Sequence, residues 1–188
     1  NCWGYGGYGQ IGNGVDVMTN GFAYKTNTPV AVSNITKGAE ISMGYFHACV
    51  LIDNGSVNCW GKGEYGQLGN GTNSTSPVNT PVYVSEITTA ISISAGYQHT
   101  CAILSGGTIK CWGHGGGGRL GNGSTSNQST PVSVSNINNA IAISSGYSHT
   151  CALLSDSSIK CWGSGNAGQL GNGSNSSSSS PVYVSGFE

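Results

Sequence analysis

Charged side chains are scarce in this sequence. Only 7% of its 188 residues are Asp, Glu, Lys or Arg, whereas soluble domains usually carry about 25%. Six basic residues face seven acidic ones, so the net charge is −1 and no basic surface is available to neutralise phosphates. The composition therefore predicts that nucleic acid is not a partner.

Long apolar runs and helical periodicity are also missing. No stretch approaches the roughly 18 apolar residues that cross a bilayer, so we expect no membrane span. No window keeps the i, i+3, i+4, i+7 apolar spacing of an amphipathic helix. The acidic residues share no register, and no nucleophile recurs beside a histidine, so we expect no catalytic residues and no cofactor. The chain is thus predicted not to be an enzyme.

Glycine, in contrast, is abundant, and the sequence repeats itself. Glycine accounts for 32 residues, and the tripeptide Cys-Trp-Gly occurs around Trp3, Trp60, Trp112 and Trp162, a period of about 50 residues. Histidine and Pro-Val keep the same period, at His47, His99 and His149 and at Pro29, Pro81, Pro131 and Pro181. Residues 1–188 are therefore predicted to form one repeat array, with approximate units 1–48, 49–100, 101–150 and 151–188, of which the first begins and the last ends in mid-repeat.

Short alternating segments predict four strands in each complete unit. In one copy they cover residues 91–94, 100–104, 108–112 and 131–134. Four strands in about 50 residues, joined by Gly-rich turns, are typical of a propeller blade. Proline is expected at strand starts, where its missing donor is not needed. The predicted fold class is all-β: tandem four-stranded blades, propeller-like, in a partial, open or longer array.

Four segments recur in fixed order: Gly-Tyr-x-His-Thr-Cys-Ala-x-Leu, Cys-Trp-Gly, Gly-Gln-Leu-Gly-Asn-Gly and Thr-Pro-Val. This order resembles the regulator of chromosome condensation repeat family over nearly the whole chain. The resemblance implies a β-propeller, commonly of seven blades. The founding member of the family is a nuclear nucleotide-exchange factor that docks on chromatin, but this sequence lacks the basic surface and any matching exchange-loop motif. The resemblance therefore implies a fold and not an activity.

Six of the seven cysteines form three pairs with one spacing: Cys49 with Cys59, Cys101 with Cys111, and Cys151 with Cys161. If residues 105–107 form a three-residue hairpin loop, Cys101 lies opposite Cys111, at the distance that a disulfide requires. Reduced, buried cysteines are the alternative, and zinc is disfavoured because each blade would supply only two ligands. We expect three intra-repeat disulfides, no metal site, and an extracellular or cell-surface location. Cys2 is left unpaired, as a free thiol or an intermolecular partner.

The other recurring residues are predicted to be structural. His47, His99 and His149 are expected to be hydrogen-bonding groups of the repeat rather than catalytic bases. An aromatic ring beside the cross-link is the best apolar anchor of a small blade. We therefore expect equivalent, largely buried sites for Trp3, Trp60, Trp112 and Trp162.

Segments 72–80, 124–130 and 174–180 consist almost wholly of Ser, Thr and Asn. They are predicted to be solvated loops on one face or on the rim. Asn-x-Ser/Thr sequons gather there, and although such a composition produces sequons by accident, some glycosylation is expected in a eukaryotic source. The eight candidates are Asn34, Asn54, Asn70, Asn73, Asn122, Asn127, Asn172 and Asn175.

The leading functional hypothesis is an extracellular structural or adhesive repeat protein, a component of a surface fibre or larger array. It follows from ends that fall in mid-repeat, which predict self-association or continuation in a longer chain. The alternative is a secreted propeller that binds a sugar or protein ligand through loops on one face, with Tyr5, Tyr8 and Tyr65 available for contact. An intracellular exchange factor or scaffold would require reduced cysteines.

Overall fold

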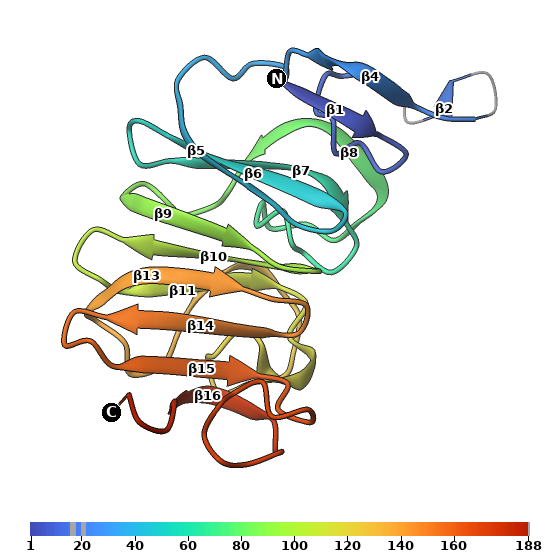
Figure 1. Ribbon diagram of the computed structural model, residues 1–188. Helices are drawn as coiled ribbons and strands as arrows, with labels where there is room; N and C mark the ends of the chain where they lie inside the picture. The colour runs from blue at the N-terminus through green and yellow to red at the C-terminus, as the bar shows by residue number, and fades with distance from the viewer. Residues whose placement is uncertain (16–17, 20–21, 188) are drawn as a thin grey trace.

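The computed structural model of the chain describes residues 1–15, 18–19 and 22–187, and these fold almost entirely into β-strands. Three antiparallel four-stranded sheets follow one another along the chain (Figure 1). The first contains β5 (Gly38–Met43), β6 (His47–Ile52), β7 (Val57–Gly63) and β8 (Ser74–Tyr83); the second β9 (Ala90–Ala95), β10 (His99–Leu104), β11 (Ile109–Gly113) and β12 (Gln128–Ser133); the third β13 (Ala140–Ser145), β14 (His149–Leu154), β15 (Ile159–Gly163) and β16 (Ser178–Tyr183). The all-β class and the four-stranded blades are confirmed.

The N-terminal unit contributes a smaller sheet. β1 (Cys2–Tyr5) pairs with β4 (Lys25–Val30), and Cys2 lies opposite Val30. In the first complete blade, Cys59 lies opposite Val82 in the same way. Two further short strands, β2 (Met18–Thr19) and β3 (Phe22–Ala23), pair with each other, and η1 (Gly116–Gly118) is the one helical turn among the described residues. β1 and β4 therefore correspond to the third and fourth strands of a blade.

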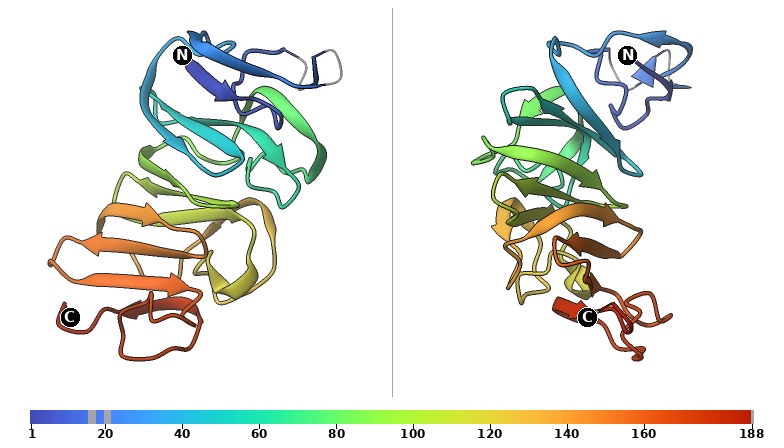
Figure 2. Two further views of the ribbon diagram at one scale, coloured as in Figure 1. Left: turned by 45° about the vertical axis from the view of Figure 1, so that its right-hand side comes forward. Right: turned by 60° about the vertical axis from the view of Figure 1, so that its left-hand side comes forward.

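The blades fan out in an open arc. Their first strands β5, β9 and β13 lie side by side, and the two termini lie at opposite ends of the arc (Figures 1 and 2). Serine side chains link these first strands, because Ser42 Oγ accepts from the Ala95 N–H at 2.9 Å and Ser94 Oγ accepts from the Ser145 N–H at 2.8 Å. The first strand is thus the inner strand of each blade, and the fourth is its outer edge.

The hairpin between the second and third strands has the predicted register. Gly107 adopts the left-handed conformation, with φ 80°, and Leu104 N–H donates to the Thr108 carbonyl at 2.9 Å. Cys101 therefore lies opposite Cys111, and disulfides join the expected pairs: Cys49–Cys59, Cys101–Cys111 and Cys151–Cys161. Their Cα atoms lie 4.0 to 4.1 Å apart, on the short side of the approach between non-hydrogen-bonded strand neighbours.

Proline does not lie where it was expected. The outer strands begin several residues before Pro29, Pro81, Pro131 and Pro181, so the prediction of proline at strand starts was wrong. The polar residues before each proline pair with the Cys-Trp-Gly strand beyond a bulge, for example Gly113 with Gln128. Proline is tolerated inside these strands because they are sheet edges. The polar segments are therefore only partly loops.

The apolar core lies between blades rather than within them. One cluster combines Leu51 and Val57 of the first complete blade with Ile93 and Trp112 of the next. The same arrangement recurs one blade further along the chain. Each sheet is thus a layer of a stack, and its faces are buried by its neighbours.

Candidate functional site

Three of the four repeated tryptophans fasten one blade to the preceding one. The indole N–H of Trp60 donates to the Gln10 carbonyl at 2.9 Å, and that of Trp112 to the Gln67 carbonyl at 3.0 Å. Both rings are buried, as is Trp162, which repeats this contact with the Arg119 carbonyl at 3.0 Å. The accepting residue is the second residue of a Gly-x-Leu-Gly or Gly-x-Ile-Gly loop in the preceding unit, and the last glycine of that loop leaves room for the indole.

Trp3 departs from this pattern. Its side chain is 64% exposed, whereas that of Trp60 is 1% exposed. The prediction of four equivalent, largely buried tryptophans was therefore wrong for Trp3. In the other three units the tryptophan ring is covered by a loop of the preceding blade. Among the described residues, no such loop lies over Trp3, and its ring is therefore exposed. The repeated tryptophan therefore stabilises the contact between two blades rather than the sheet to which it belongs.

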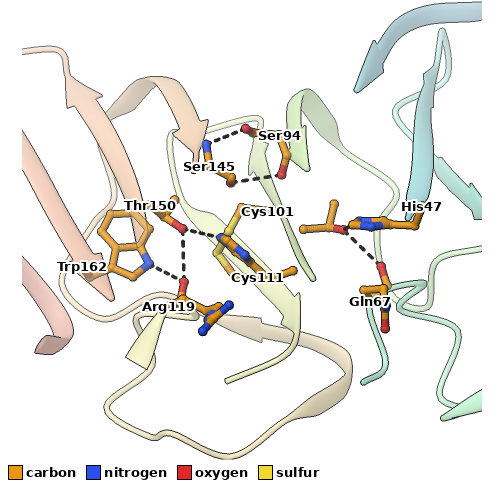
Figure 3. The surroundings of a disulfide bond; sticks show 11 residues. His47, Gln67, Ser94, Cys101, Cys111, Arg119, Ser145, Thr150 and Trp162 are labelled. Atoms are coloured by element: carbon orange, nitrogen blue, oxygen red, sulfur yellow. Dashed lines mark hydrogen bonds between the residues drawn. A yellow bond between two sulfur atoms is a disulfide. The ribbon is translucent and has the colours of Figure 1, made fainter. Parts of the chain in front are cut away.

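A second contact between blades runs through histidine and threonine (Figure 3). His47 Nε2 lies 2.8 Å from the Thr100 hydroxyl, which donates to the Gln67 carbonyl at 3.1 Å. His99 and Thr150 repeat the arrangement at 2.8 Å, with Thr150 donating to the Arg119 carbonyl at 3.2 Å. Because the hydroxyl proton goes to the carbonyl, the histidine must donate from Nε2. His47 and His99 thus bridge to the blade that follows.

These histidines are neutral. Burial lowers the pKa of His47 to about 4 and that of His99 well below its ordinary value. Their Nδ1 atoms are buried without a hydrogen-bond partner, so nothing stabilises a charged ring. His149 is less buried, and burial lowers its pKa too. A threonine whose proton already serves a carbonyl is not activated by its histidine, so the pair is a link between blades and not a nucleophile with its base.

The threonines were missed by the sequence reasoning. Thr100 and Thr150 both follow a repeated histidine, and that repetition was the available signal. Ala48 occupies the equivalent position after His47, which hid the pattern. The glycines of the Gly-Tyr pairs leave space for the repeated histidines. A Cβ on Gly44, for example, would collide with the ring of His47.

Aromatic rings gather at the end of the blades that holds the turns from the first to the second strand and the loops after the third strand. We call this group the aromatic surface, and it consists of Tyr5, Tyr8, Tyr45, Phe46, Tyr65, Tyr97 and Tyr147. Tyr97 stacks on Tyr147 with ring centroids 4.0 Å apart and lies 4.9 Å from Tyr45, while Tyr8 packs on Phe46 at 4.6 Å. Tyr45 and Tyr147 remain 64% and 65% exposed. Six of the nine tyrosines of the chain therefore share one end of the molecule.

Lys62 lies among these rings. Its Nζ is 5.5 Å from the centroid of Phe46, 5.7 Å from Tyr8 and 6.0 Å from Tyr65. It also pairs with Glu64 at 2.7 Å, and that hydrogen bond raises the pKa of Lys62. The ammonium group thus connects Tyr65 to the other rings through cation–π contacts.

A hollow of about 320 Å³ opens beside three of the tyrosines. It is lined by Met43, Ala95 and Ser145 together with the Gly-Tyr pairs that follow the inner strands. The sequence had suggested Tyr5, Tyr8 and Tyr65 for binding, and all three lie on the aromatic surface. The remaining rings were not assigned a role, although the threefold repetition of Gly-Tyr could have marked three of them.

None of the eight sequons is one of the aromatic residues, but six of them lie in loops at the same end of the strands, and Asn70 and Asn73 share the loop of Tyr65. Asn34 and Asn54 lie at the opposite end of the strands, in the connection to β5 and in the hairpin after β6. The other six lie in or beside the loops that lead to the outer strands: Asn70, Asn73, Asn122, Asn127, Asn172 and Asn175. Asn70, Asn122 and Asn172 are half-buried, and each Oδ1 accepts a backbone N–H two residues on. The other five are exposed.

Cys2 is a free, buried thiol. Burial raises its pKa, which lowers the fraction of reactive thiolate at neutral pH. Among the described residues, no group of three His, Cys, Asp or Glu side chains is placed to hold a metal ion. The described residues also include no helix long and apolar enough to cross a membrane.

With this geometry in place, comparison with known proteins identifies the repeat. The regulator of chromosome condensation (RCC1) repeat matches residues 54–103, 107–153 and 160–188. The chain belongs to the RCC1 repeat family. A second RCC1 repeat description matches residues 39–67, 90–119 and 140–169.

Relatives of this RCC1-repeat chain are much longer. It is 30% identical over 119 residues to the ultraviolet-B receptor UVR8 of Arabidopsis thaliana, and the match covers 63% of this chain and 26% of the receptor. It is 32% identical over 123 residues to the probable E3 ubiquitin-protein ligase HERC4 of Mus musculus, covering 64% of this chain and 11% of the ligase. The chain thus spans about a quarter or less of these relatives.

Solved structures share the fold. Yeast RCC1 (Prp20), solved with Kap60 bound, superposes with a TM-score of 0.82 at 20% identity, covering 97% of this chain and 43% of that one. Human WBSCR16 gives a TM-score of 0.80 at 21% identity, covering 95% and 45%. The RCC1-repeat arc therefore corresponds to less than half of each of these chains.

Proposed function

We propose that this chain is part of a non-enzymatic, extracellular propeller that binds a protein partner through its aromatic surface. The observation that carries the proposal is the concentration of exposed rings around a hollow at one end of the blades. Tyrosine is enriched in protein interfaces because it offers a large, rigid contact area with a polar tip. Yeast RCC1 has been solved as a complex with another protein, Kap60.

A protein partner fits this surface better than a sugar. The loops around the rings are rich in Gly, Ser and Asn besides Tyr, which is the composition of antibody binding loops. Sugar stacking needs a free ring face, and the stacking of Tyr97 on Tyr147 covers one face of each of these rings. A protein partner can also use their edges and hydroxyl groups.

The proposed location rests on the cysteines. Three buried cross-links of one geometry favour an oxidising compartment. Thiol labelling of the natural protein under non-reducing conditions tests this location. We expect at most Cys2 to react after unfolding, and labelling of all seven cysteines would contradict an extracellular site.

Glycosylation is part of the same proposal. The five exposed sequons, Asn34, Asn54, Asn73, Asn127 and Asn175, are the preferred acceptors. Asn70, Asn122 and Asn172 are less available because their side chains are half-buried. Glycopeptide mass spectrometry of the natural protein should show higher occupancy at the exposed set, and the reverse order would contradict the assignment.

Site-directed photo-crosslinking tests the binding role. A photoreactive phenylalanine derivative replaces Tyr97 in the natural full-length chain, and a matched variant carries it at Tyr183, an exposed tyrosine on outer strand β16. We expect a discrete adduct with another protein from position 97 and none from position 183. Equal adducts, or none from position 97, would contradict the proposal.

A structural or adhesive array is the second candidate. It is favoured by Ile41, Ile91 and Ile141, which remain exposed on the inner strands and would be covered by further repeats or by other copies. Proline in every outer strand opposes strand addition at the rim. Electron microscopy of the natural protein distinguishes the candidates, because a fibre component is polymeric and a binding module is a discrete particle.

A further inference from the structure

We infer that the aromatic surface recognises an acidic polypeptide segment that places one apolar side chain in the hollow beside Tyr45, Tyr97 and Tyr147. This inference rests on the proposed function and specifies the chemistry of the partner. Three observations support it: the charge at that end of the molecule, the absence of an ion-pair partner for Arg119 among the described residues, and the lining of the hollow.

The few charges of the chain are unevenly distributed. Lys25, which pairs with Tyr5 in the small sheet, Lys62 and Arg119 lie at the aromatic end, and Glu64 is the described acidic residue there. Among the described side chains, three positive charges and one negative charge therefore lie at this end. The opposite end has no such excess, because the acidic residues of its turns are matched in number by lysines: Asp53, Glu86 and Asp156 against Lys37, Lys110 and Lys160. In a chain of net charge −1, the aromatic end is the part that attracts an acidic partner.

Arg119 is unusual among its equivalents. The corresponding residues of the other units are Gln10, Gln67 and Gln169, and each glutamine Oε1 accepts the backbone N–H two residues before it. Arg119 instead donates from Nε to the Gly116 carbonyl at 2.8 Å and from a terminal nitrogen to the Tyr147 carbonyl at 3.3 Å. One of four equivalent positions thus carries a cation, which lies directly behind the row of Tyr45, Tyr97 and Tyr147, here called the tyrosine row.

Arg119 is largely buried, with 7% of its surface exposed, but its guanidinium group keeps unused donors. It has five N–H groups, and the structure assigns a protein acceptor to two of them. It forms no ion pair with any carboxylate of the described residues. A carboxylate from a partner would supply the planar, charge-assisted contact that arginine favours.

The hollow is suited to an apolar group. Met43 and Ala95 line it, and the tyrosine rings border it, so its lining is largely hydrocarbon and aromatic. Its volume of about 320 Å³ is at the lower end of binding pockets and accommodates a single leucine or phenylalanine side chain. Buried anchors of this kind, ringed by polar contacts, supply most of the energy of protein interfaces.

A selection experiment tests the inference. Phage-displayed random dodecapeptides are selected on the immobilised chain, and the binders are measured against three variants. Tyr97→Ala removes the centre of the tyrosine row. Arg119→Gln restores the residue found in the other units and should therefore fold. Lys160→Gln, in β15, removes a charge that contacts Tyr183 and the Asn136 carbonyl instead.

We expect binders that combine Asp or Glu with an apolar residue. Their affinity should fall about tenfold or more in Tyr97→Ala and Arg119→Gln, stay unchanged in Lys160→Gln, and weaken with added salt. Binders that depend on Tyr97 but lack acidic residues and ignore Arg119→Gln would overturn the inference and leave the proposed function standing. Failure to recover any Tyr97-dependent binder would overturn both.

Discussion

The first unit and the first complete blade share the sequence Cys-Trp-Gly but bury it differently. Trp3 is 64% exposed and Trp60 is 1% exposed. Both rings stand on the third strand of a unit, one residue after a repeated cysteine. The difference is the Gln10 loop, which covers Trp60 and accepts its indole proton. Burial of this residue is therefore set by the preceding neighbour and not by its own sheet.

This comparison describes how the array is stabilised. Each core cluster draws on two consecutive blades, and each histidine bridge spans two blades. The free energy of unfolding should then be close to a sum of nearest-neighbour terms, as in other repeat proteins. Substitutions at equivalent positions should differ in effect according to whether a neighbour is present.

The largest difference is expected at the tryptophans. Trp112→Ala removes a fully buried ring between two blades and should lower the free energy of unfolding by about 3 to 5 kcal/mol. Trp3→Ala removes an exposed ring and should change it by less than about 1 kcal/mol. Urea unfolding of both variants measures the contrast. Equal losses would show that the ring stabilises its own sheet.

The next effect is a loss of stability in acid. His47 has a pKa of about 4 in the folded chain and about 6.5 unfolded, so between these values only the unfolded state binds the proton. Stability is therefore complete above pH 6.5 and declines as the pH falls towards 4. The integrated loss for this histidine is about 3 kcal/mol. Thermal melts across this pH range should show the decline.

His149 sharpens the comparison within the same experiment. It is less buried than His47, so its NMR titration should have a midpoint closer to the ordinary histidine value. His47→Gln should flatten the pH dependence of stability below pH 6.5. A slope that survives this substitution and the equivalent change at His99 would contradict the assignment.

Features set by local sequence were predictable, and features set by neighbouring blades were not. The cysteine register followed from the three-residue turn before Thr108, because the position of a glycine fixes a short hairpin. The exposure of Trp3 could not be predicted from local sequence, because it depends on a contact between units. The proline positions were missed because pairing beyond a bulge extends the outer strand into a polar segment. The tyrosine row required the blades to be stacked, although its Gly-Tyr signal was visible.

The disulfides should contribute less than the tryptophans and act within a blade. Replacing both Cys101 and Cys111 by alanine removes a closed loop of about 11 residues, worth about 2.7 kcal/mol on the chain-entropy estimate. Cys2→Ala breaks no cross-link and should have the smaller effect. Urea unfolding of the two variants, without reductant, compares them. A greater loss for Cys2→Ala would show that packing of this thiol against the next blade outweighs the cross-link, and would contradict the expected order.

The smallest effect concerns the hairpin turns, where the same contrast recurs. Gly55, Gly107 and Ser157 occupy equivalent positions with φ of 82°, 80° and 71°. A Cβ on Gly107 would lie 2.8 Å from the Asn138 carbonyl oxygen, because that turn packs against the connection to the next blade, whereas Ser157 is exposed. Ser157→Gly relieves left-handed strain and should stabilise by up to about 1 kcal/mol, whereas Gly107→Ser should destabilise by more than about 1 kcal/mol. Thermal unfolding of both variants decides the point. If serine is tolerated equally at the two positions, the neighbouring blade does not restrict the turn, and the contrast between Trp3 and Trp60 would not extend to this end of the sheets.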